Sequence, residues 1–241
     1  TSGCASLSAP PGLSSLPEQM DTPGSDSLKT ELESMLTNDL VAGIAGRAGL
    51  ADKLLLHAEL TLAANQRLNL TSIVEPRDVA LKHFLDSLAP HSLLKPGERV
   101  LDLGSGAGYP GIPLACALDL QEMILAESTL KKARFLQETA DELALPTIKV
   151  IGERGEEILR RVKVDTVIAR AVGPADRLMK MLERVTRNFG RLLLYKGPDP
   201  SAELAKARNT ASNLKLSDEI VLAYDLPGGI GSRSIVEYRH R

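Results

Sequence analysis

The sequence predicts an α/β fold in which a helical N-terminal cap precedes a parallel, doubly wound sheet. From residue 27 to about residue 94, apolar side chains recur at three- and four-residue steps, as they do on the buried face of a helix. Beyond Pro96 and Gly97 the pattern changes to short apolar runs that are bounded by turns and alternate with helical segments. Strands separated by helices are joined by crossovers, which favours parallel pairing.

The first residues differ from the rest in composition. Half of residues 1–28 are Ser, Pro or Gly, and none is Lys or Arg. Such a segment buries too little apolar surface to offset the entropy of ordering, so we expect residues 1–26 to form a disordered tail. It has neither the apolar stretch of a secretory signal nor the arginines of a mitochondrial presequence, and we therefore expect a cytoplasmic protein.

We expect residues 27–95 to form the helical cap. Its first helix begins at Ser27, a residue type that caps helix N-termini, and its second extends from about residue 50 to residue 68. A third helix begins near Asp78, after a polar stretch that ends at Pro76.

We expect residues 96–241 to form one domain around the sheet. Two of its apolar runs, residues 219–224 and 234–238, are separated by the turn formers Pro227, Gly228 and Gly229, which favours a C-terminal antiparallel hairpin. The expected parallel strands are residues 99–103, 123–127, 147–151, 165–169 and 191–195.

Composition excludes several classes of protein. No stretch approaches the roughly 20 apolar residues of a membrane span, so we expect no membrane association. Cys4 and Cys116 are far apart and the four histidines are scattered, which argues against a disulfide scaffold and against a metal site. The formal net charge of −2 excludes a polycationic nucleic-acid coat.

A glycine-rich loop follows the first predicted strand and opens a helix. Gly104, Gly106 and Gly108 allow the backbone to turn sharply and to approach a ligand closely. Glu127 stands at the end of the next strand, where a carboxylate can accept hydrogen bonds from both hydroxyls of a ribose. These residues predict a ligand that contains a nucleoside.

The identity of that nucleoside stays open on spacing alone. Residues 106–111 satisfy the glycine fingerprint of dinucleotide-binding proteins, so NAD is one candidate. The glycine series starts earlier, however, because Asp102 and Gly104 precede it. That longer series resembles the first motif of methyltransferases that use S-adenosylmethionine.

Six segments together resemble the RsmG/GidB family, the small-subunit ribosomal RNA methyltransferase G. The runs at residues 83–87 and 108–113 are more specific than a bare glycine motif. The resemblance extends from about residue 50 to the C-terminus. The segments that carry it are residues 69–73, 82–88, 102–113, 134–136, 170–172 and 196–197.

The resemblance implies a class I, Rossmann-like methyltransferase. It implies transfer of a methyl group from S-adenosylmethionine to N7 of one guanine in the decoding-centre loop of 16S rRNA, with 16S rRNA or the small ribosomal subunit as the partner. Guanine N7 has an in-plane lone pair, so its methylation needs alignment and exclusion of water rather than a general base. The chain has no Asn/Asp-Pro-Pro-aromatic motif and no cysteine beside the predicted site, which argues against exocyclic-amine and pyrimidine-C5 methylation.

The resemblance also implies roles for individual residues. Gly104 and Tyr109 would contact the cofactor, and Gly155 with Glu156 would meet its adenine. Arg170 would lie near the reacting groups, as a catalytic and cofactor-binding residue. The competing interpretations are a carboxylate that stabilises a helix start for Glu156 and a structural ion pair for Arg170.

RNA binding requires cations and hydrogen-bonding groups around the crevice. Because the chain has seven aromatic residues and no Trp, we expect phosphate contacts and RNA shape to matter more than base stacking. The helix face that carries Lys131 and Lys132 is interpreted as a solvated surface. The candidate RNA-binding residues are Lys82, His83, Lys196 and Arg233.

Two other functions compete with this one: an NAD-dependent oxidoreductase and a nucleotide-binding module without catalysis. An oxidoreductase should present a catalytic His, Cys or Tyr-x-x-x-Lys at the carboxyl edge of the sheet, and Tyr195-Lys196 lacks that spacing. A binding module would keep the glycine loop while tolerating any residue at Arg170. We further expect the protein to be a monomer.

Overall fold

The computed structural model describes residues 25–241. Most of the predicted tail, residues 1–26, lies outside the described residues. Ser25 and Asp26 belong to the first turn of helix α1, so the helical region begins two residues earlier than the sequence predicts.

Helices and strands alternate along most of the chain, as the apolar pattern predicts. The short helices η1, η3 and η4 are 3-10 helices, and η2 is a π-helix. In chain order the elements are α1 Ser25–Leu36, η1 Asp39–Val41, α2 Leu50–Leu68, α3 Pro76–Asp78, η2 Val79–Leu85, α4 Asp86–Leu88, η3 Ala89–Leu93, β1 Arg99–Leu103, α5 Gly111–Ala117, β2 Glu122–Ala126, α6 Leu130–Glu142, β3 Ile148–Ile151, α7 Gly155–Leu159, β4 Val164–Arg170, α8 Ala175–Leu182, η4 Thr186–Asn188, β5 Phe189–Lys196, α9 Ser201–Asn213, β6 Leu216–Leu226 and β7 Gly231–His240.

The described residues form a seven-stranded sheet in the order β3-β2-β1-β4-β5-β7-β6. Strands β1 to β5 are parallel, whereas β7 pairs antiparallel with both β5 and β6. The predicted α/β fold with a C-terminal antiparallel hairpin is therefore confirmed. The hairpin strands are longer than the predicted runs because their pairing continues through polar residues, from Leu216 opposite His240 to Leu226 opposite Gly231.

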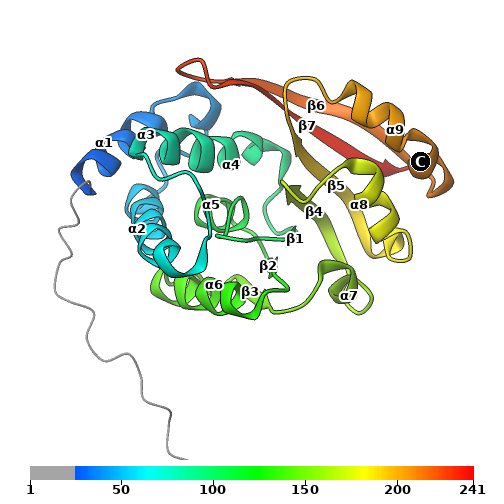
Figure 1. Ribbon diagram of the computed structural model, residues 1–241, viewed down its shortest axis with the longest axis horizontal. Helices are drawn as coiled ribbons and strands as arrows, with labels where there is room; N and C mark the ends of the chain where they lie inside the picture. Colours follow the sequence, from blue (N-terminus) through cyan, green and yellow to red (C-terminus); the bar gives the residue numbers. More distant parts are fainter. Residues whose placement is uncertain (1–24) are drawn as a thin grey trace, which may run out of the picture.

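Helices cover both faces of the sheet (Figure 1). The N-terminal helices lie with α5 and α6 on one face, and α7, α8 and α9 lie on the other. Each face has its own apolar core, because successive side chains of a strand point to opposite faces. Along β5, for example, Leu193 and Tyr195 belong to the core under the N-terminal helices, whereas Leu192 and Leu194 belong to the core under α8 and α9.

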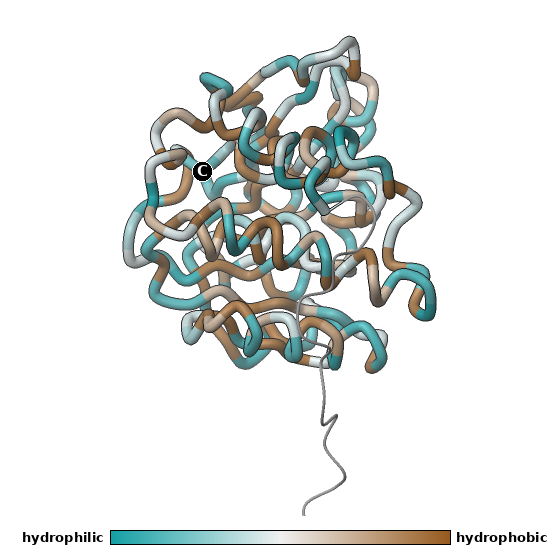
Figure 2. The backbone as a smooth tube through the Cα atoms, turned by 90° about the vertical axis from the view of Figure 1, so that its left-hand side faces the viewer, coloured by the Kyte–Doolittle hydropathy of each residue, from teal (hydrophilic) through white to brown (hydrophobic). Residues whose placement is uncertain are grey.

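The coloured tube in Figure 2 shows the same arrangement. Hydrophobic stretches run through the interior of the molecule, and many of the outer turns are hydrophilic. Within residues 25–241, no helix combines the length and the apolar character needed to cross a membrane.

The third helix of the N-terminal region differs from a simple α-helix. It begins at Pro76, close to the predicted start, and then changes to the π-helix η2 over Val79–Leu85 before α4 continues it. A π-turn widens the helix and is often found at functional sites. This segment packs against the carboxyl edge of the sheet, where Arg170 contacts it.

Candidate cofactor and substrate site

The carboxyl ends of the parallel strands bring the predicted site residues to one edge of the sheet. Gly104 follows β1, Glu127 follows β2, and Arg170 is the last residue of β4, the strand on the other side of β1. Ligands of open α/β sheets bind at this edge. A pocket of about 240 Å³ opens here, and Gly104, Glu127, Gly155, Glu156 and Val172 are among the residues that line it.

The conformation of the glycine loop requires residues that lack side chains. Gly104 has a φ of +74°, and a Cβ on it would come within 2.7 Å of the Val172 Cγ1 atom. Gly108 has a φ of +94°, and its Cβ would lie 2.5 Å from the Ile112 Cδ1 atom. Both the left-handed backbone and the close contacts therefore require glycine at these positions.

Glu127 is fixed at the wall of the pocket by two backbone amides. The Gly106 N–H donates to its Oε2 atom at 3.1 Å, and the Thr129 N–H donates to its Oε1 atom at 2.7 Å. The residue is 8% exposed. Each carboxylate oxygen can accept more than one hydrogen bond, so Glu127 keeps acceptor capacity for the hydroxyls of a ligand.

Gly155 and Glu156 line the same pocket from the start of α7. A Cβ on Gly155 would lie 2.0 Å from the Leu103 Cδ1 atom, so glycine lets α7 approach the end of β1. The Glu156 carboxylate lies 3.7 Å from the Arg154 guanidinium and belongs to the first helical turn. Glu156 thus both lines the pocket and places a carboxylate in the first turn of α7.

Asp102, which precedes the glycine loop, is a buried residue of β1. Its Oδ2 atom accepts a hydrogen bond of 3.1 Å from the Gly111 N–H at the start of α5. Burial raises the pKa of Asp102 to about 7, although the hydrogen bond from Gly111 opposes this rise. The Ser105 hydroxyl donates to the main-chain carbonyl of Asp102 at 3.0 Å. Asp102 thus ties β1 to the helix that follows the glycine loop.

Tyr109 does not line the pocket. Its ring stacks between His57 and His83, at centroid distances of 4.5 and 4.3 Å, and only 6% of the residue is exposed. The glycine loop turns this side chain toward the N-terminal helices, where burial raises the pKa of its hydroxyl. The Tyr109 side chain therefore faces away from the pocket. A contact between the Tyr109 backbone and the cofactor stays a prediction.

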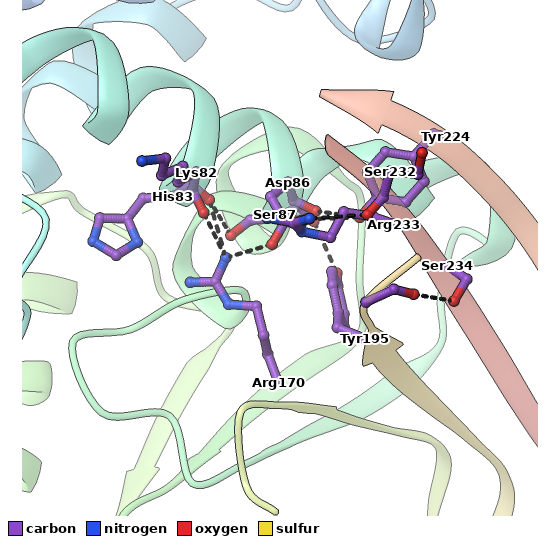
Figure 3. A network of polar contacts seen from close by, with 11 residues as sticks. Lys82, His83, Asp86, Ser87, Arg170, Tyr195, Tyr224, Ser232, Arg233 and Ser234 are labelled. Atoms are coloured by element: carbon purple, nitrogen blue, oxygen red, sulfur yellow. Dashed lines mark hydrogen bonds and ion pairs between the residues drawn. The ribbon is translucent and has the colours of Figure 1, made fainter. Parts of the chain in front are cut away.

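Arg170 lies at the same edge but is held by the N-terminal helices (Figure 3). Its Nη1 atom donates to Asp86 Oδ2 at 3.1 Å, and to the carbonyl oxygens of Lys82 at 3.2 Å and His83 at 3.4 Å. Its Cζ atom lies 5.5 Å from the centre of the Tyr109 ring. The ion pair considered in the sequence analysis is therefore present. Among residues 25–241, Nε and Nη2 of Arg170 have no hydrogen-bond partner.

The candidate RNA-binding residues do not all lie together. Lys82 and Arg233 lie with Asp86 on the side of the N-terminal helices, where Lys82 forms an ion pair of 2.8 Å with Asp78. Lys196 follows Tyr195 in β5 and so points to the opposite face of the sheet. There its Nζ atom lies 2.6 Å from the carboxylate of Glu203 on α9.

His83 differs from the cation that RNA binding would use. It is buried, and its Nε2 atom forms a hydrogen bond of 2.8 Å with the Thr71 hydroxyl. Burial, together with the charge of Arg170, lowers the pKa of His83 to about 3, which favours the neutral ring. Because the ring is buried and bonded to Thr71, the structure does not favour a charged contact between His83 and a phosphate.

No group of three His, Cys, Asp or Glu side chains within the described part of the chain is arranged to hold a metal ion.

Solved structures with the same fold define the class. M. capricolum TrmK in complex with S-adenosyl-homocysteine has a TM-score of 0.51 at 13% identity, over 63% of this chain and 66% of that one. The B. subtilis tRNA methyltransferase TrmK has a TM-score of 0.52 at 16% identity, over 67% of this chain and 68% of that one. Together with the strand order and the glycine loop, this similarity defines a Rossmann-like methyltransferase fold.

Sequence relatives define the family. The model of the GidB family, described as "rRNA small subunit methyltransferase G", matches residues 51–227. A protein of that name from Solibacter usitatus is 42% identical over 87% of this chain and 98% of its own length. Another from Nitrosococcus oceani is 40% identical over 78% of this chain and 85% of its own length. The chain belongs to the family of the small-subunit rRNA methyltransferase G, as its motifs indicate.

Proposed function

We propose that this protein transfers the methyl group of S-adenosylmethionine to N7 of a guanine in the decoding-centre loop of 16S rRNA. Family membership supports the class of reaction and the rRNA substrate. The observation that carries the proposal at the site is the Glu127 carboxylate, which lies beside Gly104 at the carboxyl edge of the sheet. An NAD-dependent oxidoreductase and a non-catalytic module have no support from the family.

The residues at the pocket suit S-adenosylmethionine. Glu127 would accept hydrogen bonds from the ribose hydroxyls, because its oxygens keep free lone pairs after binding two amides. Gly104 and Gly155 both line the pocket, and their lack of side chains permits close contacts with Val172 and Leu103. The predicted adenine contact of Glu156 is retained in this proposal, since Glu156 lines the same pocket.

Methyl transfer to N7 requires the protein mainly to orient the cofactor and the base. When bound, the cofactor supplies an electrophilic methyl group on a sulfonium, and the N7 lone pair of guanine is the nucleophile. No proton has to be removed from N7, so the protein needs to align the base and exclude water. We assign the alignment to Arg170, whose Nε and Nη2 atoms can donate to acceptor atoms of the base or of a phosphate.

The proposed RNA surface lies on the side of the N-terminal helices. Lys82 and Arg233 remain candidates. We add Arg77, an exposed residue of α3, the helix that leads into the segment with Lys82. Its guanidinium lies against Gly228 in the β6–β7 turn. Lys196 is left out of this surface because it faces α9. The partner is 16S rRNA, free or in the small subunit, and we propose a cytoplasmic location for that reason. That the protein is a monomer stays a prediction.

The proposal is tested by methylation in vitro. The purified protein is incubated with methyl-labelled S-adenosylmethionine and 16S rRNA that lacks the modification, and the labelled nucleotide is mapped. We expect label at N7 of a single guanine in the decoding-centre loop. Label on another atom would refute the guanine-N7 assignment, and the absence of any label on free rRNA and on small subunits would refute the activity.

A further inference from the structure

The π-helix η2 provides the carbonyl groups that contact Arg170. In a π-turn, hydrogen bonds connect residues five apart. The His83 carbonyl also accepts from the Asp86 N–H and from the Ser87 hydroxyl. The carbonyl oxygens of Lys82 and His83 both lie within hydrogen-bond distance of Arg170 Nη1. The guanidinium is thereby attached to the helix at one of its terminal nitrogens.

Asp86 follows this π-helix and binds a donor at each oxygen (Figure 3). Its Oδ2 atom accepts from Arg170 at 3.1 Å, and its Oδ1 atom accepts from the Tyr224 hydroxyl at 2.8 Å. The Arg233 Nε atom lies 3.9 Å from the same Oδ1 atom. Asp86 is 7% exposed. A buried carboxylate held by β4, β6 and β7 has little freedom to rotate.

We propose that Asp86 and Tyr224 are positioning residues, which hold the Arg170 guanidinium so that Nε and Nη2 face the substrate. This inference rests on the proposed function, in which Arg170 aligns the guanine. A free arginine side chain has many rotamers, and fixing one of them before the substrate binds lowers the entropic cost of alignment. Arg233 also contributes a second positive charge, so the cluster remains positive although Asp86 offsets the charge of Arg170.

The simpler alternative is that these contacts only attach the N-terminal helices to the sheet. The chain contains a matched control for this alternative. The hydroxyl of buried Tyr195 donates to the Ser87 carbonyl at 2.9 Å, one residue beyond Asp86. This bond also joins the sheet to the same helix. Tyr195 lies beside Arg170 in the register of β5 against β4, but its hydroxyl forms no hydrogen bond with Asp86 or Arg170. Tyr224→Phe and Tyr195→Phe therefore each remove one hydroxyl from the same interface.

The experiment compares these two variants in methyl transfer to 16S rRNA. We expect Tyr224→Phe to lower kcat about 3- to 10-fold without a change in KM for S-adenosylmethionine, because alignment and not cofactor binding is impaired. We expect Tyr195→Phe to keep kcat within about twofold of the wild type. Its thermal stability should fall by about as much as that of Tyr224→Phe, because each variant loses one hydrogen bond at the same interface. Asp86→Asn should lower kcat further, since its amide nitrogen would face one of the two donors, Arg170 or Tyr224.

A double mutant gives the second test. If Tyr224 acts through Arg170, Tyr224→Phe should not lower kcat further in an Arg170→Ala background. Equal losses of kcat in Tyr224→Phe and Tyr195→Phe, or additive losses in the double mutant, would overturn the positioning role and leave the proposed function intact. A wild-type protein that transfers no methyl group to rRNA would instead overturn the proposed function, and this inference with it.

Discussion

At the scale of single residues, the site depends on carboxylates that are already held by the backbone. Glu127 accepts two amide hydrogen bonds and Asp86 accepts bonds from two side chains, so neither has to reorganise when a ligand arrives. The two carboxylates serve different ends of the site. Glu127 lines the pocket, whereas Asp86 lies behind Arg170 on the side of the N-terminal helices.

Glu127→Ala tests the cofactor end. We expect the dissociation constant for S-adenosylmethionine to rise by a factor that corresponds to about 1 to 3 kcal/mol, because charge-assisted hydrogen bonds to the ribose are lost. Calorimetric titration measures this change. Glu157→Ala is the control, since Glu157 lies on α7 outside the pocket and pairs with Arg160 at the surface. Equal affinity in both variants would show that Glu127 does not contact the cofactor.

Arg170→Ala tests the substrate end. We expect methyl transfer to fall at least about 10-fold, which corresponds to about 1.4 kcal/mol of lost alignment. Arg170→Lys should recover only part of the rate, because an ammonium keeps the charge but lacks the planar fork that also reaches Asp86. Single-turnover kinetics with bound cofactor measures this step. If folded Arg170→Ala kept full activity, Arg170 would not align the substrate, and its role would be the structural ion pair with Asp86.

At the scale of elements, the alternation of side chains along β5 places Tyr195 and Lys196 on opposite faces of the sheet. Tyr195 points toward the N-terminal helices and Lys196 points toward α9, so the candidate RNA-binding residues are divided between the two faces of the sheet. The Glu203 carboxylate that pairs with Lys196 also accepts the Ala175 N–H at the start of α8. Lys196 therefore stabilises the junction of β5, α8 and α9.

The salt dependence of RNA binding distinguishes these faces. We expect Lys82→Ala combined with Arg233→Ala to lower the slope of log K against log salt by about one unit per lost phosphate contact. Lys196→Ala should keep the slope and lower the thermal unfolding temperature, because it leaves Glu203 without its cation. Filter binding at several salt concentrations measures the slope. If Lys196→Ala also lowered the slope of log K against log salt, Lys196 would contact the RNA.

The elements could be predicted from the sequence to the extent that local patterns define them. The strands, the glycine loop and the place of Glu127 follow from apolar runs and glycine spacing, which are local. The π-helix could not be predicted, because the apolar pattern of residues 79–85 also fits an α-helix. Nor could the face of Lys196 or the stacking of Tyr109, since both depend on which side of the sheet the N-terminal helices cover.

At the scale of the whole molecule, three buried titratable groups near the glycine loop affect stability in opposite directions. His57 and His83 have pKa values lowered by burial to about 4 and about 3, so they stay neutral in the folded protein. Asp102 has a pKa raised by burial to about 7, so it is protonated in the folded protein over most of the acidic range. The Nε2–H group of His57 donates to the Ala107 carbonyl oxygen at 2.9 Å.

The free energy of unfolding should therefore decrease as pH falls from about 6 to about 4.5. In this window the unfolded chain binds protons at both histidines, with an ordinary pKa of about 6.5, whereas the folded protein does not. The folded protein binds one proton at Asp102, whereas the unfolded chain, with a pKa of 3.8, does not. One net proton favours unfolding, which gives a slope of about 1.4 kcal/mol per pH unit from these three groups.

Asp102→Asn should steepen this dependence, because it removes the one group whose protonation favours the folded state. The amide oxygen of Asn can still accept the Gly111 N–H, so the link between β1 and α5 is preserved. Two net protons then favour unfolding, and the slope should approach about 2.8 kcal/mol per pH unit. Urea unfolding at several pH values measures it, with Asp141→Asn on the exposed face of α6 as the control. If Asp102→Asn and the control have the same slope as the wild type, Asp102 is ionised in the folded protein, and the hydrogen bond from the Gly111 N–H must then help to balance its buried charge.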